Sequence, residues 1–198
     1  MDAMMTVKQI ERSWSAKHYE RLFRDLTVSR SETVSMIEAE GDWSIPAAAM
    51  ALIRMDELIQ SHVPLYRQLL RAVVDSQGSD GSWGDPAITA LCLRALLCGD
   101  GQGLSIERGM EFLARLQKPE GLWPKYPLRR MPEDALVSAF ILFELGDQPA
   151  FQTAVRMDDV VGWFESNESF LDGTAKDLWS QAAQRCRAKL REVAVSWS

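Results

Sequence analysis

Two kinds of hydrophobic pattern alternate along the middle of the chain. Three segments are apolar on almost every side, which is typical of helices buried in a core. They span residues 46–55, 86–98 and 135–145. The segments 64–77 and 105–117 instead carry one apolar stripe at helical spacing, formed in the first of them by Leu65, Leu69 and Val73. This alternation predicts an all-α fold with a buried layer and an amphipathic layer.

Both amphipathic segments end in the same short signature, Q-x-x-x-G-x-W. The copies are Gln77–Gly81–Trp83 and Gln117–Gly121–Trp123, and they lie 40 residues apart. A fixed period of this length indicates a repeat protein, here with a pair of helices in each unit. Glycine at a helix end adopts the left-handed conformation, and a glutamine amide can bond backbone groups there or in the next unit. We therefore interpret the glutamines and tryptophans as contacts between neighbouring repeats.

The same period is weaker outside these two copies. Gly41 and Trp43 form a third, degenerate copy, in which Ile37 replaces the glutamine. Trp163 also continues the spacing, but Val161 stands where the glycine should be, and we interpret this match as a coincidence.

The remaining segments predict further helices and a single domain. Helices are expected over 7–28 and 31–40, and a last unit over 149–165 and 174–193 with a loop at 170–173. The predicted domain spans 1–198, with N-terminal helices in 1–40, clear repeats in 41–145 and a degenerate last repeat in 146–198.

Composition excludes several classes of function. The net charge of −6 argues against a nucleic acid partner, because phosphate binding requires a basic surface. No apolar run is long enough to span a bilayer, and the first residues lack the pattern of a secretory signal. The cysteines, at positions 92, 98 and 186, are odd in number and scattered, which suits reduced thiols. These features predict a cytoplasmic protein without a transmembrane segment.

The paired signatures, each followed by an apolar helix, resemble the terpenoid cyclase and protein prenyltransferase superfamily, whose members are α/α-toroids. The segment Asp-Gly-Ser-Trp-Gly-Asp at 80–85 is especially similar to squalene-hopene and class II terpene cyclases. The resemblance covers residues 41–145 and implies about four helical hairpins with an inner and an outer layer. The family's ring has about six hairpins, so an incomplete ring with exposed apolar edges is implied. We expect a homodimer or a protein partner at those edges.

The resemblance also implies a place for an acid catalyst. Class II cyclases protonate their substrate with a carboxylic acid from a D-x-D-D motif, and the nearest match here is Met-Pro-Glu-Asp at 131–134. Glu133 holds the proton-donor position and Asp134 follows it, so these two are the candidate catalytic residues. The alternative is structural, because proline and acidic residues are favoured in the first turn of a helix.

No metal site and no cofactor are predicted. Protein prenyltransferases bind zinc through Asp, Cys and His, but the two histidines, His18 and His62, both lie outside the predicted buried helices that form the core. Cys92 and Cys98 are six residues apart and do not share a face of their helix.

A basic group surrounds the second signature, with Lys118, Lys125, Arg129 and Arg130 interleaved with Trp123 and Tyr126. Such a group could hold an isoprenoid diphosphate, although basic residues in a loop are more often simply solvated. The candidate ligand-binding residues are Trp83, Trp123, Tyr126, Arg129 and Arg130. The expectation is a small non-catalytic or accessory repeat protein that binds a protein partner or an apolar, isoprenoid-like ligand. The alternative is a divergent terpene cyclase or prenyltransferase acting on an isoprenoid substrate.

Overall fold

The computed structural model describes residues 45–59, 61–62, 64–99, 103–124 and 134–196, with side chains as far as Cys186. These ranges fold into helices and loops and contain no strand, which confirms the all-α prediction. The helices are α3 (Ile45–Glu57), α4 (Pro64–Asp75), α5 (Pro86–Leu97), α6 (Gly103–Leu116), α7 (Asp134–Leu145), α8 (Pro149–Ala154), α9 (Met157–Asn167), the 3₁₀ helix η1 (Glu168–Phe170) and α10 (Gly173–Ser196). The helices expected over 7–28 and 31–40, and the degenerate signature at Gly41, lie outside the described residues.

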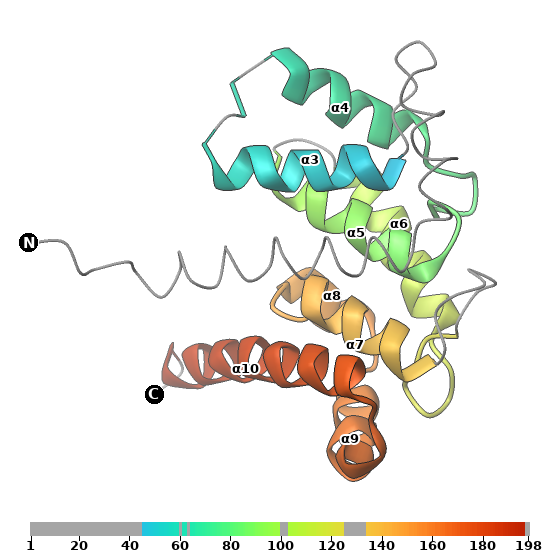
Figure 1. Ribbon diagram of the computed structural model, residues 1–198, viewed down its shortest axis with the longest axis vertical. Helices are drawn as coiled ribbons and strands as arrows, with labels where there is room; N and C mark the ends of the chain where they lie inside the picture. The colour runs from blue at the N-terminus through green and yellow to red at the C-terminus, as the bar shows by residue number, and fades with distance from the viewer. Residues whose placement is uncertain (1–44, 60, 63, 100–102, 125–133, 197–198) are drawn as a thin grey trace, which may run out of the picture.

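The helices pack in two rows (Figure 1). In the first row, α3, α5, α7 and α10 pack against one another in this order. The second row begins with α4, which packs on α3, and continues with α6 on α5 and α8 beside α6. Consequently α3 and α10 lie at opposite ends of the first row, with α5 and α7 between them.

Burial follows the predicted alternation from α4 to α7, whereas α3, which was predicted to be buried on almost every side, buries only Ala48, Ala49, Leu52 and Ile53. Every residue of α7 from Ala135 to Leu145 is buried, and α5 is buried over most of its surface. By contrast, α4 buries only Tyr66, Leu69 and Val73. The predicted stripe is wrong at its first position, because Leu65 is exposed and Tyr66 is buried in its place. Tyr66 lies three residues before Leu69 and seven before Val73, whereas Leu65 lies four and eight residues before them. The spacings of Tyr66 keep the buried side chains on a narrower face of the helix.

Local sequence explains where α5 begins. The Asp85 carboxylate accepts backbone N–H bonds from Ala87 at 2.8 Å and from Ile88 at 2.9 Å, so it caps the helix. Pro86 follows at the first helical position, where no helical N–H bond is lost. Asp85 is itself buried, and this burial raises the pKa of its carboxyl against the opposing effect of the two backbone bonds.

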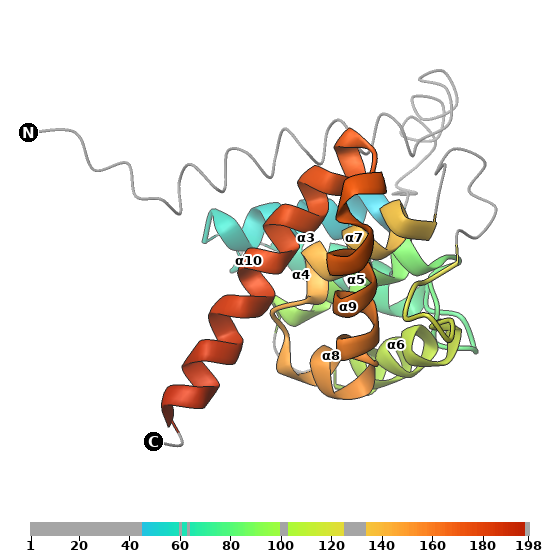
Figure 2. The ribbon, with the colours of Figure 1, turned by 90° about the horizontal axis from the view of Figure 1, so that it is seen from below.

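The last unit differs from the prediction at one place. The helix expected over 149–165 is divided into α8 and α9 by Val155 and Arg156. After η1, α10 covers the predicted 174–193 segment, and its C-terminal half extends away from the other helices (Figure 2). Among the described residues, none of the helices combines the length and the apolar composition that a membrane span requires.

Candidate functional site

The two copies of the signature form the same tight turn. In the first copy the Gly78 N–H donates to the Ser82 carbonyl at 2.8 Å. In the second copy the Lys118 N–H donates to the Leu122 carbonyl, also at 2.8 Å. Sequence similarity over seven residues is therefore matched by the same backbone hydrogen bond.

Both signature glycines are required by conformation and by space. Gly81 has φ +90° and Gly121 has φ +92°, in the left-handed region that residues with a side chain rarely adopt. A Cβ atom on Gly81 would lie 2.3 Å from the Arg108 carbonyl oxygen, and one on Gly121 would lie 2.5 Å from the Val160 nitrogen. Arg108 belongs to α6 and Val160 to α9, so each glycine lets its turn approach a helix that follows it in the chain.

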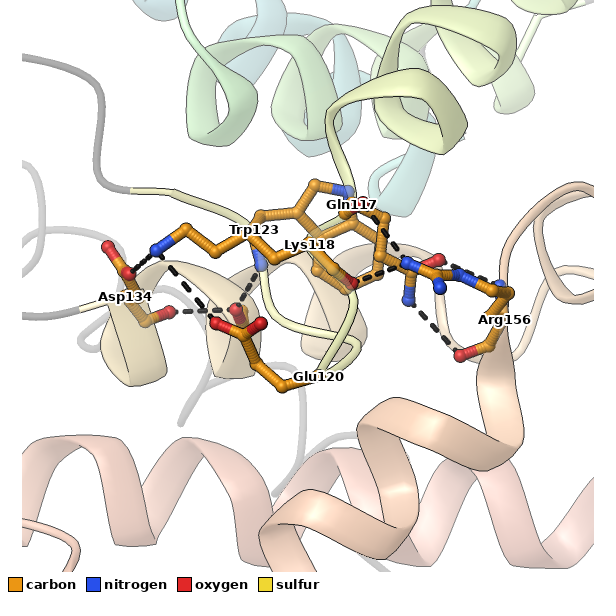
Figure 3. Close-up of polar contacts among 7 residues, drawn as sticks. Gln117, Lys118, Glu120, Trp123, Asp134 and Arg156 are labelled. Carbon is orange, nitrogen blue, oxygen red and sulfur yellow. Dashed lines mark hydrogen bonds and ion pairs between the residues drawn. The ribbon is translucent and has the colours of Figure 1, made fainter.

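The signature glutamines join each turn to the same next helix. Gln77 Nε2 donates to the carbonyl oxygens of Gly81 and Ser105, both at 2.9 Å. Gln117 Nε2 donates to Gly121 at 2.8 Å and to the Arg156 carbonyl at 3.1 Å, while its Oε1 accepts the Arg156 N–H at 2.8 Å (Figure 3). This docking explains the break before α9, because the Arg156 N–H bonds a side chain and not the preceding helix.

The signature tryptophans are buried and hold the turns from the other side. Trp83 Nε1 donates to the Val73 carbonyl at 2.6 Å, and Trp123 Nε1 donates to the Leu113 carbonyl at 2.7 Å. Each ring therefore caps the end of the helix that precedes its own turn. The Trp123 side chain has no exposed surface and stacks on Phe151, with ring centroids 5.8 Å apart. The indole nitrogens thus already have partners within the protein.

In both copies an arginine also bonds the turn, which the sequence pattern did not indicate. We refer to the contacts of one signature turn with the helices on either side of it as a joint. Arg108 Nη2 donates to the carbonyls of Gly78 at 3.3 Å and Ser79 at 3.0 Å in the first turn. Arg156 Nη2 donates to the carbonyls of Gln117 and Lys118 in the second. The two arginines are not 40 residues apart, so a search at the signature period does not pair them.

The period changes after the second tryptophan. The Trp83 N–H donates to the hydroxyl of Thr89, six residues later, whereas the Trp123 N–H donates to Ser138, fifteen residues later. The second unit therefore contains an insertion between its turn and its buried helix. Trp163 lies inside α9 and not at a turn, so the interpretation of its spacing as a coincidence is confirmed.

Of the candidate catalytic residues, Asp134 is described and Glu133 lies outside the described residues. Asp134 is the first residue of α7, and its Oδ2 lies 2.5 Å from Lys118 Nζ (Figure 3). The hydrogen bond that the Lys118 ammonium donates to Asp134 raises the pKa of this ammonium. Lys118, one member of the predicted basic group, is thus paired with an acidic residue. Its other members, Lys125, Tyr126, Arg129 and Arg130, lie outside the described residues.

A cavity of about 600 Å³ lies between the α8–α9 segment and α10. Its lining consists of Gln152, Val155, Arg156, Met157, Asp158, Asp159, Val161, Trp179, Ala183 and Cys186. Trp179 is buried and stacks on Phe164, with ring centroids 4.7 Å apart. We refer to this cavity as the α9–α10 pocket. It combines apolar walls with charged residues from the first turn of α9.

Charge at the pocket is mostly negative. The Arg156 guanidinium is engaged by the second turn, and its Nη1 lies 3.6 Å from Asp159. Asp158 is exposed and makes no ion pair within the described residues. Burial, followed by the nearby Asp147 carboxylate, raises the pKa of the Cys186 thiol to about 11. This thiol is therefore protonated and unreactive at neutral pH.

No group of His, Cys, Asp and Glu side chains in the described part of the chain has the arrangement of a metal site. Comparison of the chain with protein-family models, with curated proteins and with solved structures gives no match. Its function must therefore be inferred from the residues and their geometry.

Proposed function

We propose that this chain is a small, non-catalytic repeat protein of the α/α-toroid kind that binds an apolar group in the α9–α10 pocket. The pocket itself is the observation that carries the proposal. Its volume of about 600 Å³ falls within the range of cavities that take small ligands. Apolar walls with a few polar groups at the edge are the usual composition of such sites.

Repeated joints support the architecture in this proposal. In both copies a turn is fixed by its tryptophan to the preceding helix, α4 or α6, and by its glutamine to the start of a following helix, α6 or α9. Repetition of one joint places successive hairpins side by side, as in other repeat proteins. The first row, α3 to α10, then forms the inner layer of an incomplete ring.

The chemistry of the pocket favours an apolar group without a negative charge. Val155, Met157 and Val161 offer aliphatic surface, and Trp179 offers an aromatic face. An isoprenoid chain or an apolar protein segment fits this lining. Asp158 and Asp159 at the edge would repel a diphosphate, so an isoprenoid alcohol is the better probe. The three cysteines are free thiols, which supports the expected cytoplasmic location.

Titration with farnesol tests the pocket, with tryptophan fluorescence and calorimetry as the readouts. We expect saturable binding of one equivalent per chain, weaker binding of farnesyl diphosphate, and loss of binding in Ala183→Trp, which fills the pocket. Ala150→Trp is the matched control, because Ala150 is exposed on α8 and does not line the pocket. Equal farnesol binding by the parent and Ala183→Trp would refute the assignment of this pocket.

A second candidate, a divergent terpene cyclase or prenyltransferase, rests on the paired signatures and on Glu133 and Asp134. Protonation of an alkene requires a carboxylic acid that stays protonated. Asp134 is instead paired with the Lys118 ammonium at 2.5 Å, and Glu133, which holds the proton-donor position, lies outside the described residues, so we rank this function second. Incubation with geranylgeranyl diphosphate and squalene, followed by gas chromatography, tests it. A cyclic product that is lost in the Glu133→Gln, Asp134→Asn double variant would establish the enzyme.

A further inference from the structure

The connection between α3 and α4 carries the most exposed aliphatic side chain of the described residues. Ile59 is 82% exposed and its neighbour Leu58 is 51% exposed. Leu65, on the first turn of α4, is also exposed. We refer to Leu58, Ile59 and Leu65 as the α3–α4 tip. Exposed apolar side chains are unfavourable in water, and a patch of them often marks a site where a partner binds.

Backbone strain coincides with this exposure. Ile59 has φ +58°, and its N–H donates to the Asp56 carbonyl at 2.9 Å, so it ends α3 in the left-handed conformation. Glycine is the usual residue here, and a β-branched side chain opposes this conformation. The position thus carries both strain and apolar exposure, and a glycine would remove both. Strain of this kind is retained mainly at functional sites.

The charges beside the tip complement those of the α9–α10 pocket. Arg67 and Arg71 are exposed on α4 and form no ion pair within the described residues, whereas Arg54 is paired with Glu57 at 2.9 Å. The pocket carries Asp158 and Asp159 at its edge. The α4 side of the tip is therefore basic and apolar, whereas Asp56 and the Arg54–Glu57 pair lie on its α3 side. The pocket of the same chain is acidic and apolar.

We propose, on the basis of the function given above, that the α9–α10 pocket receives the α3–α4 tip of a second copy of this chain. The tip and the pocket of one chain lie at opposite ends of the first row, separated by α5 and α7, so a chain cannot fill its own pocket (Figure 1). Two copies can dock reciprocally, each tip entering the other's pocket, which gives a closed dimer with twofold symmetry. Such a dimer extends the incomplete ring of one chain with the hairpins of the other.

Sedimentation of the full chain over a concentration series tests this dimer. We expect a mass of twice 22.3 kDa at micromolar concentration. Ile59→Asp should weaken the dimer by about thirtyfold, the usual effect of removing a central apolar contact. Leu104→Asp, which places the same charge on the exposed start of α6, should leave the dimer intact. Light scattering gives the same masses independently.

Charge reversal tests the pairing without disturbing any buried residue. Asp158→Arg in the pocket and Arg67→Asp near the tip should each weaken the dimer, and the double variant should recover part of the loss. Mixing Ile59→Asp with Ala183→Trp should restore association, since one intact tip and one open pocket remain in the mixed dimer. Tip-to-tip association would instead leave Ala183→Trp dimeric alone, and this result would overturn the proposal.

Farnesol binding separates this inference from the proposed function. If the tip occupies the pocket, monomeric Ile59→Asp should bind farnesol more tightly than the parent at micromolar concentration. A parent that binds farnesol but sediments at 22.3 kDa would overturn the dimer and leave the pocket's function standing. If the tip instead binds a lipid surface, the parent will be monomeric and will bind vesicles of phosphatidylcholine and phosphatidylserine, and Ile59→Asp will not.

Discussion

The two signature glutamines provide an internal comparison, because they occupy equivalent joints with different numbers of hydrogen bonds. Gln117 makes three, two through Nε2 and one through Oε1, and it is buried. Gln77 is half-buried and makes two, both through Nε2. Replacing each by leucine keeps the approximate volume of the side chain and removes these bonds. We expect Gln117→Leu to be the more destabilising change.

The size of the effect follows from the bonds that are lost. A typical hydrogen bond contributes about 0.5–1.5 kcal/mol, and a buried polar group left without a partner costs about 1–3 kcal/mol. Gln117→Leu leaves the Arg156 N–H without its acceptor, and we expect a loss of roughly 2–4 kcal/mol. Gln77→Leu removes donors from carbonyls only, and we expect roughly 1–2 kcal/mol.

Urea denaturation followed by far-ultraviolet circular dichroism measures both changes. The midpoint should move while the slope with urea stays constant, because neither change alters the surface exposed on unfolding. Melting temperatures should fall in the same order, by roughly 2–4 °C for each kcal/mol. An equal loss of unfolding free energy in Gln77→Leu and Gln117→Leu would show that the number of hydrogen bonds does not set the strength of the joint.

Four further outcomes are expected. Trp123→Ala should cost about 3–5 kcal/mol in urea unfolding, as large-to-small core changes do. Gly121→Ala should destabilise by more than the roughly 1–2 kcal/mol of Gly84→Ala, because both have a left-handed φ but only a Cβ on Gly121 meets the next helix. Burial raises the pKa of Asp85 in the folded protein. The stability that this pKa shift contributes is therefore fully present below pH 3.8 and decreases as pH rises through the folded-state pKa. The free energy of unfolding of Asp85→Asn, relative to that of the parent, should therefore be higher at pH 7 than at pH 3 in urea unfolding. Asp85→Ala, which removes the cap, should cost about 1 kcal/mol. With a pKa of about 11, Cys186 should react with Ellman's reagent at pH 8 at least about a hundred times more slowly in the native protein than in urea.

Features that depend on neighbouring residues in the sequence could be predicted. The buried helices α5 and α7 are recognisable because apolar residues cover their whole circumference. Gln117, Gly121 and Trp123 are recognisable because the turn that they build is short and occurs twice. Their structural role follows from elementary chemistry, since glycine permits the turn, the amide bonds backbone groups and the indole fills space.

Features that depend on how the hairpins meet could not be predicted. The break at Arg156 is set by Gln117, 39 residues earlier, and no local signal distinguishes this residue from a helix interior. The α9–α10 pocket depends on the distance between two helices, which their individual patterns do not specify. Strain at Ile59 is likewise invisible in the sequence, because isoleucine rarely ends a helix in the left-handed conformation.

The joint, and not the 40-residue period, is what the two units have in common. The insertion after Trp123 changes the period but leaves the joint unchanged, because the glutamine, glycine and tryptophan all precede it and longer loops cost little free energy. After α9 the described residues form no such joint: Asn167, the last residue of α9, donates to the Trp163 carbonyl of its own helix. Asp172 still caps α10 through the Ala175 N–H, as Asp85 caps α5. The buried helix α10 is therefore capped like α5, but no joint precedes it, and the pocket lies between α10 and the α8–α9 segment.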